Sequence, residues 1–151
     1  MKMITVKEIS GVYKTKTING IAGDRVLDGP SKVSNLFVEL FGDATEEHFV
    51  AFYLDTKNKL VAFGIISKGT VSETLVHPRE IFKLALLANA SRMIISHNHP
   101  SGDITPSNED KAVTTKLKQC GDLMGIAVFD HVIVNTENRS FLSMQEEGHF
   151  Y

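Results

Sequence analysis

Residues 92–110 read RMIISHNHPSGDITPSNED, and this stretch predicts a strand, a loop and the start of a helix. The run 92–96 is almost continuously apolar, as expected of a central strand that is covered on both faces. Two prolines and a glycine in 100–106 then interrupt regular structure. Ser107 is a favourable N-cap residue, and the acidic groups that follow it suit the N-terminal end of a helix dipole. We expect this helix to end near Gly121 or Gly125.

Two histidines at the end of the predicted strand indicate a metal site. His97 and His99 are one residue apart, so in an extended chain both imidazoles project from the same face. Ser107 and Asp110 follow on the first turn of the predicted helix. Two neutral imidazoles and one carboxylate form the open ligand set of catalytic zinc, with water in the fourth position. The spacing His-x-His-x7-Ser-x-x-Asp therefore predicts a zinc site held by His97, His99 and Asp110.

Two alternative interpretations of these residues remain open. Ser107 and Asp110 also have the spacing of a capping box, which would stabilise the helix without any metal. The histidines just before the loop favour metal ligation, and Ser107 can both begin the helix and face the site. Two histidines and a carboxylate also describe the facial triad of non-haem iron oxygenases, and the spacing alone does not separate zinc from iron.

Metal-assisted hydrolysis needs one more group, a carboxylate that takes a proton from the metal-bound water. Glu46 and Glu47 immediately precede an aromatic-rich strand candidate that begins at His48. A glutamate at the start of a neighbouring strand can reach over a metal. A glutamate pair at a strand entrance is, however, more often a solvated charge.

The stretch 30–143 resembles the RadC-like bacterial branch of the JAMM (MPN-plus) metalloprotease superfamily. The metal motif matches that superfamily in every position, and further stretches look like RadC proteins in particular: Gly69-Thr70, VHPREIF at 76–82, HNHPSG at 97–102, and Asp130-His131. The resemblance implies zinc on His97, His99 and Asp110, with Glu47 as general base. It favours Glu47 over Glu46 because the family's glutamate lies two residues before Phe49. It also implies that Ser107 stabilises the oxyanion while a peptide or isopeptide amide is hydrolysed.

RadC proteins also carry an old DNA-repair label. Longer members have an N-terminal helix-hairpin-helix-like region, which we do not expect in this chain. The formal net charge is −2, with 16 Lys and Arg against 18 Asp and Glu. This balance gives no electrostatic footprint for nucleic acid or an anionic membrane. We therefore expect a peptide or protein substrate, no strong nucleic-acid binding and no membrane partner.

The whole pattern predicts an α/β fold with a mixed sheet flanked by helices, and the resemblance implies the superfamily's deaminase-like layers. We expect residues 1–29 to be an N-terminal strand, at 3–9, and a connector packed on a RadC-like JAMM domain at 30–151. The remaining expected helices are at 31–41 and from Pro78 to about Ala90. The remaining expected strands are at 49–54, 60–67 and 140–142, with one more formed by the apolar runs 126–129 and 132–134 around Asp130-His131.

Composition fits one compact domain, since 151 residues with 42% hydrophobic content can bury a sizeable core. The sequence has no apolar stretch long enough to span a bilayer and no signal-peptide pattern. Cys120 is the single cysteine, so no internal disulfide forms, and we expect a buried thiol in a reducing cytoplasm.

The other histidines receive weaker predictions. We expect a structural role for His77 at a helix entrance and exposure for His48 and His149. The Asp130-His131 pair either supports a ligating imidazole or is a polar pair at a strand edge.

Three classes of function therefore compete. They are a zinc-dependent peptidase or isopeptidase, a metal-bearing interaction module of DNA metabolism without turnover, and an iron-dependent oxygenase. A zinc base deaminase is excluded because that class needs a Cys-x-x-Cys pair.

Overall fold

The computed structural model describes Thr5, Lys7 and residues 13–14, 25–69 and 76–150. The elements in order are α1 (Pro30–Phe41), β1 (His48–Leu54), β2 (Leu60–Lys68), α2 (Pro78–Leu87), β3 (Arg92–Asn98), α3 (Asn108–Met124), β4 (Ala127–Val134) and β5 (Phe141–Ser143). The five strands form one sheet in the order β2-β1-β3-β4-β5. The β3–β4 pair is parallel and the other neighbours are antiparallel, which confirms the predicted mixed α/β fold. Of the expected strand at 3–9 only Thr5 and Lys7 are described, and neither is assigned to a strand; the rest lies outside the described residues.

Helix boundaries follow local signals closely. Both α1 and α2 begin with a proline, which is suited to the first helical position because its missing N–H has no partner there. The α2 helix ends three residues before the predicted Ala90. Asn89 has a φ of 53°, and this left-handed conformation, which asparagine tolerates, stops the helix. The α3 helix ends at Gly125, the second of the two predicted stops, also in the left-handed conformation.

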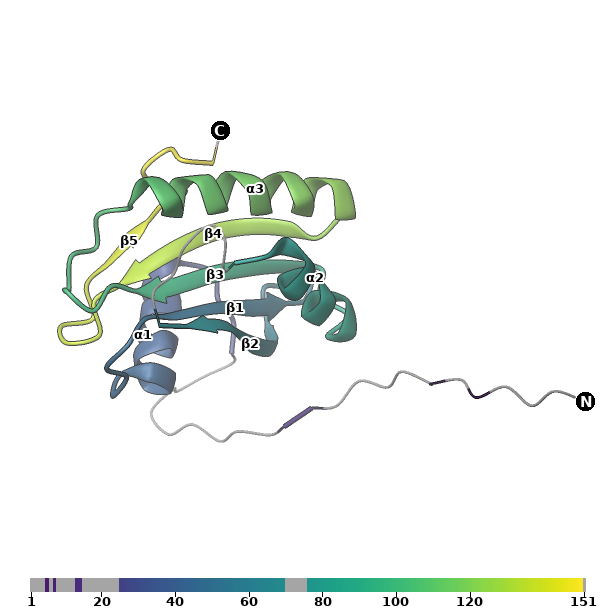
Figure 1. The fold of residues 1–151 in the computed structure, drawn as a ribbon, viewed down its shortest axis with the longest axis horizontal. Coiled ribbons are helices and arrows are strands. Elements are labelled where there is room, and N and C mark those ends of the chain that lie inside the picture. The colour runs from purple at the N-terminus through teal and green to yellow at the C-terminus, as the bar shows by residue number, and fades with distance from the viewer. Residues whose placement is uncertain (1–4, 6, 8–12, 15–24, 70–75, 151) are drawn as a thin grey trace, which may run out of the picture.

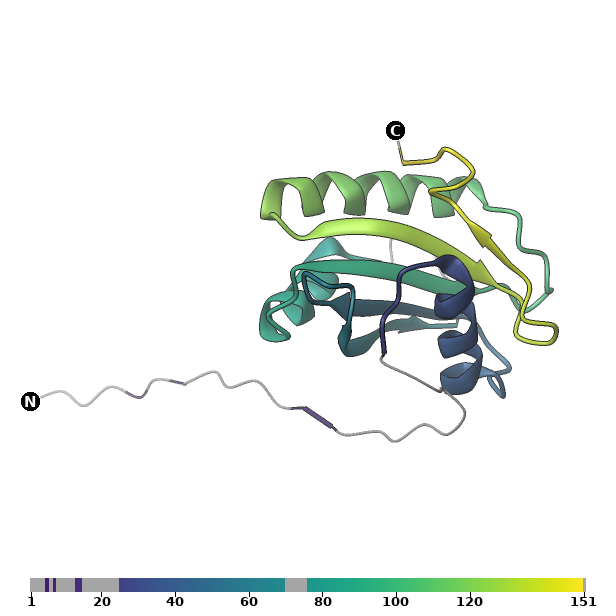
Figure 2. The same ribbon diagram turned by 180° about the vertical axis from the view of Figure 1, so that it is seen from behind.

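The helices cover the sheet from both sides (Figure 1). Figure 2 shows that α1 covers the face of the sheet opposite to the face covered by α3. Under α1 lies a cluster of buried aliphatic and aromatic side chains, which we call the α1-face core: Leu27, Val33, Leu36, Phe37, Phe41, Val50, Phe52, Leu54, Ile94, Val132 and Val134. The other side, the α2/α3 face, has its own core, which includes Tyr53, Ile81, Met93, Ile95, Val113 and Leu117.

A β-bulge divides β4. The sequence predicts one strand from two apolar runs around Asp130-His131, and residues Ala127–Val134 do form one strand, whose pairing with β3 skips Phe129. Met93 pairs with Val128, and Ile94 already pairs with Asp130. Because side chains alternate between faces, one extra residue reverses the facing of everything after it. The bulge therefore places His131, the partner of Ile95, on the α2/α3 face.

Two further expectations concern the burial of Cys120 and the absence of a helix that could span a membrane. Cys120 is partly exposed at the edge of the α2/α3 core, so the prediction of a buried thiol is wrong. Within the described ranges, no helix is both long and apolar enough to cross a membrane.

Candidate metal centre

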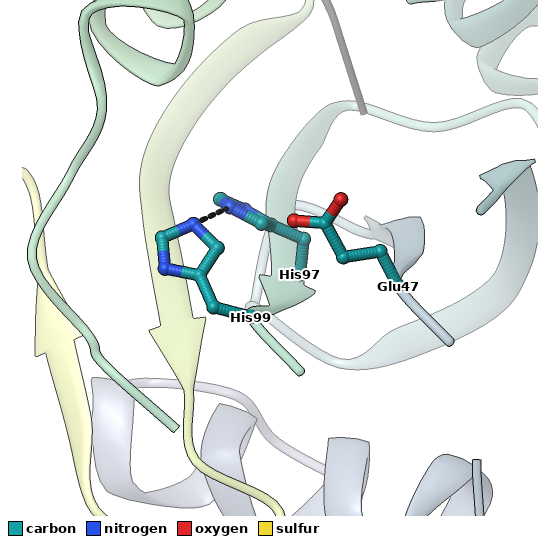
Figure 3. A group of neighbouring side chains, drawn as sticks. All are labelled: Glu47, His97 and His99. Carbon is teal, nitrogen blue, oxygen red and sulfur yellow. Dashed lines mark hydrogen bonds between the residues drawn. The ribbon is translucent and has the colours of Figure 1, made fainter. Parts of the chain in front are cut away.

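The two predicted histidine ligands meet where β3 leaves the sheet. His97 pairs with Phe49 of β1, is fully buried, and stacks its ring on the Phe49 ring at a centroid distance of 5.7 Å. His99 lies one residue beyond the strand, and its side chain is 16% exposed. The two Nε2 atoms are 2.9 Å apart. The dashed line in Figure 3 marks this contact.

Asp110 reaches both rings from the first turn of α3. Its Oδ1 lies 3.1 Å from Nε2 of His97, and its Oδ2 lies 3.1 Å from Nε2 of His99. Asp110 also completes a capping box: its N–H donates to Ser107 Oγ over 3.0 Å, and its Oδ2 accepts from Ser107 N–H over 2.9 Å. The capping box and the convergence on the histidines are therefore properties of the same carboxylate and do not exclude one another.

The donor set fits a small divalent cation. Zinc bonds of about 2.0–2.1 Å in a tetrahedron place ligand atoms about 3.3 Å apart. The two Nε2 atoms are 2.9 Å apart, and each lies 3.1 Å from a different oxygen of the Asp110 carboxylate; we call this arrangement the triangle. A shift of a few tenths of an ångström in these side chains therefore accommodates the ion.

Charge is arranged to favour a cation at this triangle. Burial by itself would raise the pKa of the Asp110 carboxyl, but hydrogen bonds from His97 and His99 outweigh it and hold that pKa far below its usual range. The same hydrogen bond to Asp110 raises the pKa of His99. Asp110 is therefore ionised at neutral pH, and a metal ion competes with a proton for His99.

Glu47 is a second carboxylate close to the two histidine rings. It precedes β1 and is half-buried, and a carboxylate oxygen lies within 4.8 Å of ring nitrogens of His97 and His99. Its carboxylate points toward His97 in Figure 3. Glu46 is exposed, and no contact of its carboxylate with these histidines occurs among the described residues. The geometry brings Glu47, and not Glu46, to the predicted site.

Asn98, between the two histidines, holds the segment that carries Glu47. It is 2% exposed; its Oδ1 accepts from His48 N–H over 2.8 Å, and its Nδ2 donates to the Glu46 carbonyl over 3.2 Å. These bonds bracket Glu47 on both sides. The sequence reasoning missed this residue, although its strand parity, opposite to that of the histidines, was a usable signal.

The His131 N–H donates to Asp130 Oδ1 over 2.7 Å, but the two side chains have different further partners. His131 is fully buried, and its Nε2 lies 2.7 Å from Nδ1 of His97. Burial, followed by the charge of His97, lowers the pKa of His131 well below its usual value. Asp130 instead accepts hydrogen bonds from Ser143 Oγ and the Gln145 N–H. Only His131 therefore supports a predicted ligand.

The remaining histidines lie away from the triangle. His48 is buried, contrary to the prediction, because its ring packs 5.1 Å from the Phe41 ring and its Nδ1 lies 3.2 Å from the Glu46 carbonyl oxygen. His149 is partly exposed. His77 precedes α2, where its carbonyl accepts the Glu80 N–H, and its side chain is exposed.

A groove opens beside His99. One cavity of about 320 Å³ is lined by the loops that follow α1, β3 and β4, including Asp43, His99 and Glu137. A second cavity of about 620 Å³ shares five lining residues with it and continues along the end of α1. We call these two cavities together the entrance groove. Arg139, which also lines it, forms an ion pair with Glu39 at 2.7 Å.

Comparison with known families identifies the domain. The model of the RadC-like JAB domain matches residues 27–149. The chain belongs to this family. The matched residues include the whole strand–loop–helix unit that carries His97, His99 and Asp110. Membership of this family supports the interpretation of the chain as a JAMM-like metal-binding domain.

Several bacterial proteins are similar to this RadC-like chain. It is 45% identical over 160 residues to the UPF0758 protein SH1266 of Staphylococcus haemolyticus, a match that covers 98% of the chain and 69% of that relative. A UPF0758 protein of Staphylococcus aureus is 46% identical over 121 residues, covering 80% of the chain and 55% of the relative. A UPF0758 protein of Finegoldia magna is 44% identical over 124 residues, with 82% and 55% coverage. The chain thus spans between about half and two thirds of these relatives.

Proposed function

We propose that the chain is a zinc-dependent hydrolase that cleaves a peptide or isopeptide amide bond with a metal-activated water. The observation that carries the proposal is the arrangement of four side chains. His97, His99 and Asp110 converge within 3.1 Å, and a Glu47 carboxylate oxygen lies within 4.8 Å of the histidine ring nitrogens. A metal triangle with one adjacent carboxylate is the arrangement that metal-assisted hydrolysis requires.

Each residue has a defined task in this proposal. His97, His99 and Asp110 would hold zinc, which when bound lowers the pKa of water toward about 7 and polarises a carbonyl oxygen. Glu47 takes the proton from the attacking water and returns it to the departing amine. Ser107 Oγ accepts a hydrogen bond from the Asp110 N–H. The Ser107 hydroxyl proton is not used in that bond, and it donates to the developing oxyanion.

The entrance groove supports a polypeptide as the substrate. It runs along loops as far as His99, the one residue of the triangle in its lining, so a substrate chain lying in it would pass beside His99. Asp43 and Glu137 make its lining acidic beside a metal ligand. We therefore include peptides with lysine or arginine near the scissile bond, and lysine-linked isopeptides, among the substrates to be tested.

The decisive experiment compares Glu47→Gln with Glu46→Gln in zinc-loaded protein of verified metal content. Gln keeps the size of the side chain but cannot take a proton, and the loss of a general base commonly costs about 10² to 10⁴ in rate. Glu47→Gln should bind zinc and lose cleavage of peptide and isopeptide libraries read by mass spectrometry. Glu46→Gln, whose side chain is exposed, should cleave like the parent.

The alternatives make different predictions in the same assay. Equal cleavage by Glu47→Gln and the parent would contradict the proposed mechanism. A zinc-loaded parent that cleaves no library member but binds duplex DNA at submicromolar concentration in physiological salt would favour the interaction module. That outcome is not expected from a chain of net charge −2, since phosphate-driven binding needs clustered cations.

A further inference from the structure

We propose that Asn98 is a positioning residue, which holds the backbone of Glu47 so that the Glu47 side chain stays directed toward the triangle. The inference rests on the proposed role of Glu47 as general base, but its first test needs no activity. Asn98 is the last residue of β3 and is 2% exposed. It lies between the two predicted histidine ligands in the sequence, and strand alternation directs its side chain to the opposite face of the sheet from His97.

The Asn98 side chain continues the contact between β3 and β1 where their pairing ends. The last pair of this ladder is His97 with Phe49, and the next residue toward the start of β1 is His48. The His48 N–H donates to Asn98 Oδ1 over 2.8 Å, and Asn98 Nδ2 donates to the Glu46 carbonyl over 3.2 Å. A primary amide carries one acceptor and one donor group, so a single side chain satisfies both backbone groups.

These two hydrogen bonds hold the two peptide groups that flank the Cα atom of Glu47. The Glu46 carbonyl belongs to the peptide group before this atom, and the His48 N–H belongs to the peptide group after it. Because peptide groups are planar, the backbone freedom of Glu47 consists of rotating these two planes about its Cα atom. With both planes held, the direction of the Cα–Cβ bond is fixed, and only rotation within the side chain remains to place the carboxylate.

A backbone bond holds the same segment from the side of β2. The Gly69 N–H donates to the Glu47 carbonyl over 2.9 Å. Gly69 has a φ of 88°, a conformation that glycine adopts without steric cost. The peptide group after Glu47 is therefore held at its N–H by Asn98 and at its carbonyl by Gly69. We call the Asn98 amide and the Gly69 N–H together the Glu47 clamp.

Holding this backbone matters because proton transfer depends on short distances. A general base must come within hydrogen-bond distance of the proton that it takes. A misplacement of about 1 Å in a catalytic group can cost about 10²-fold in rate. The Glu47 carboxylate points toward His97, the residue before Asn98 (Figure 3). The stretch of β3 that presents the predicted ligands therefore also sets the position of the base relative to them.

Amide hydrogen exchange of the metal-free protein, followed by NMR, tests the clamp without any activity. The His48 amide should be protected in the parent. Asn98→Leu, which nearly keeps the size of the side chain but neither donates nor accepts, should make this amide exchange about tenfold faster. Asn98→Ala is the second variant if the leucine does not fold, because the vacated space opens to the entrance groove, where water can replace the amide.

Ser96→Ala is the matched control. Ser96 is fully buried on the same strand and the same face as Asn98, and its hydroxyl donates to the Val132 carbonyl over 2.8 Å. Its loss should leave the exchange of the His48 amide unchanged. Equal acceleration in the Ser96 and Asn98 variants would assign the effect to β3 as a whole and overturn the proposal. A His48 amide that exchanges like an exposed peptide in the parent would overturn it without any variant.

Cleavage kinetics test what the clamp does for the reaction. In zinc-loaded Asn98→Leu, kcat should fall about 10²-fold, while KM and zinc affinity stay near the parent values. In the Glu47→Gln background the same substitution should cost nothing further, because Asn98 acts through Glu47. A further loss in that background would overturn the proposal. A rise in KM with unchanged kcat would also overturn it, because Asn98 would then act as a wall of the entrance groove.

The two experiments separate this proposal from the proposed function. A parent that cleaves no library member would refute hydrolysis, and the exchange of the His48 amide would still decide whether Asn98 holds the backbone of Glu47. Active parent protein together with unchanged exchange in folded Asn98→Leu would refute the clamp and leave hydrolysis standing.

Discussion

The two sides of the sheet are built for different purposes. Next to the aliphatic and aromatic α1-face core, the buried hydroxyls of Ser34 and Ser96 each donate to a backbone carbonyl. On the α2/α3 face the core begins in the same way, with Met93 and Ile95, and then continues into side chains that contact one another through polar atoms, at His97, Thr114 and His131. Apolar burial stabilises the first, whereas the second places desolvated polar groups where each one needs a partner.

This difference teaches that burial alone does not tell a stabilising residue from a functional one. Val132 and His131 are adjacent, each is 0% exposed, and they lie on opposite faces of β4. Substitutions on the α1 face should change the free energy of unfolding and leave metal affinity intact. Substitutions on the polar part of the other face should mainly change metal affinity. The following predictions test this separation, from the largest expected effect to the smallest.

The largest effect is expected from Phe52→Ala, in the middle of the α1-face core. Phe52 is fully buried, so its truncation should lower the free energy of unfolding by about 3–5 kcal/mol through lost burial and a residual cavity. Urea denaturation measures this loss. Chelator competition on the folded fraction should give the parent's zinc affinity. A large loss of affinity as well would show that the two faces are coupled.

The next effect is stabilisation by the metal itself. Zinc at 100 times its dissociation constant should raise the free energy of unfolding by about 2.7 kcal/mol, because it binds only the folded site. Thermal denaturation with and without zinc measures the change. The His97→Ala/His99→Ala double variant should show none of it, and His149→Ala should behave like the parent. Full zinc occupancy in the double variant would exclude the assigned ligands.

The metal-free protein should have its largest free energy of unfolding near pH 6.5, because the usual pKa of histidine is 6.5 and the pKa values of His99 and His131 are shifted from it in opposite directions. The hydrogen bond to Asp110 raises the pKa of His99, so its contribution is complete below about pH 6.5 and is lost as pH rises through the folded pKa. Burial lowers the pKa of His131, so its contribution is complete above about pH 6.5 and is lost as pH falls. Urea denaturation with a chelator present, over a series of pH values, measures both slopes.

His99→Asn identifies the origin of the alkaline slope. This variant should lose the decline above pH 6.5 and keep the decline below it, whereas His149→Asn should keep both. In the parent, zinc affinity should rise over the same alkaline range, because a proton and the metal compete for His99. An alkaline slope that persists unchanged in His99→Asn would contradict this assignment.

The smallest effect is expected from Ser107→Ala, which removes the helix cap of α3. Loss of the bond from the Asp110 N–H should cost about 1 kcal/mol in unfolding free energy. Ser107→Thr, which keeps a hydroxyl, should recover most of this loss. If Ser107 also donates to the oxyanion, turnover by folded Ser107→Ala should fall while zinc affinity stays near the parent value. Unchanged turnover would leave Ser107 as a cap alone.

Much of the fold could be predicted because its signals are local. Pro30, Pro78 and Ser107 mark helix starts, and each acts through the backbone geometry of its own first turn. The end of α2 was placed too late because the left-handed conformation of Asn89 has no strong signature in a single sequence. The two apolar runs in β4 predict one strand but not the bulge at Phe129, because a bulge becomes visible only against its pairing partner.

The sequence by itself determined the candidate ligands, since strand parity and helix spacing place His97, His99 and Asp110 within reach of one loop. Only the tertiary structure decided which glutamate faces them and that Asn98 brackets it. It also decided that His131 and Thr114, 17 residues apart, meet behind His97. Spacing along a chain fixes the facing of side chains within one element. Contacts between elements depend on register, and in β4 the register is set by the single residue that the pairing skips.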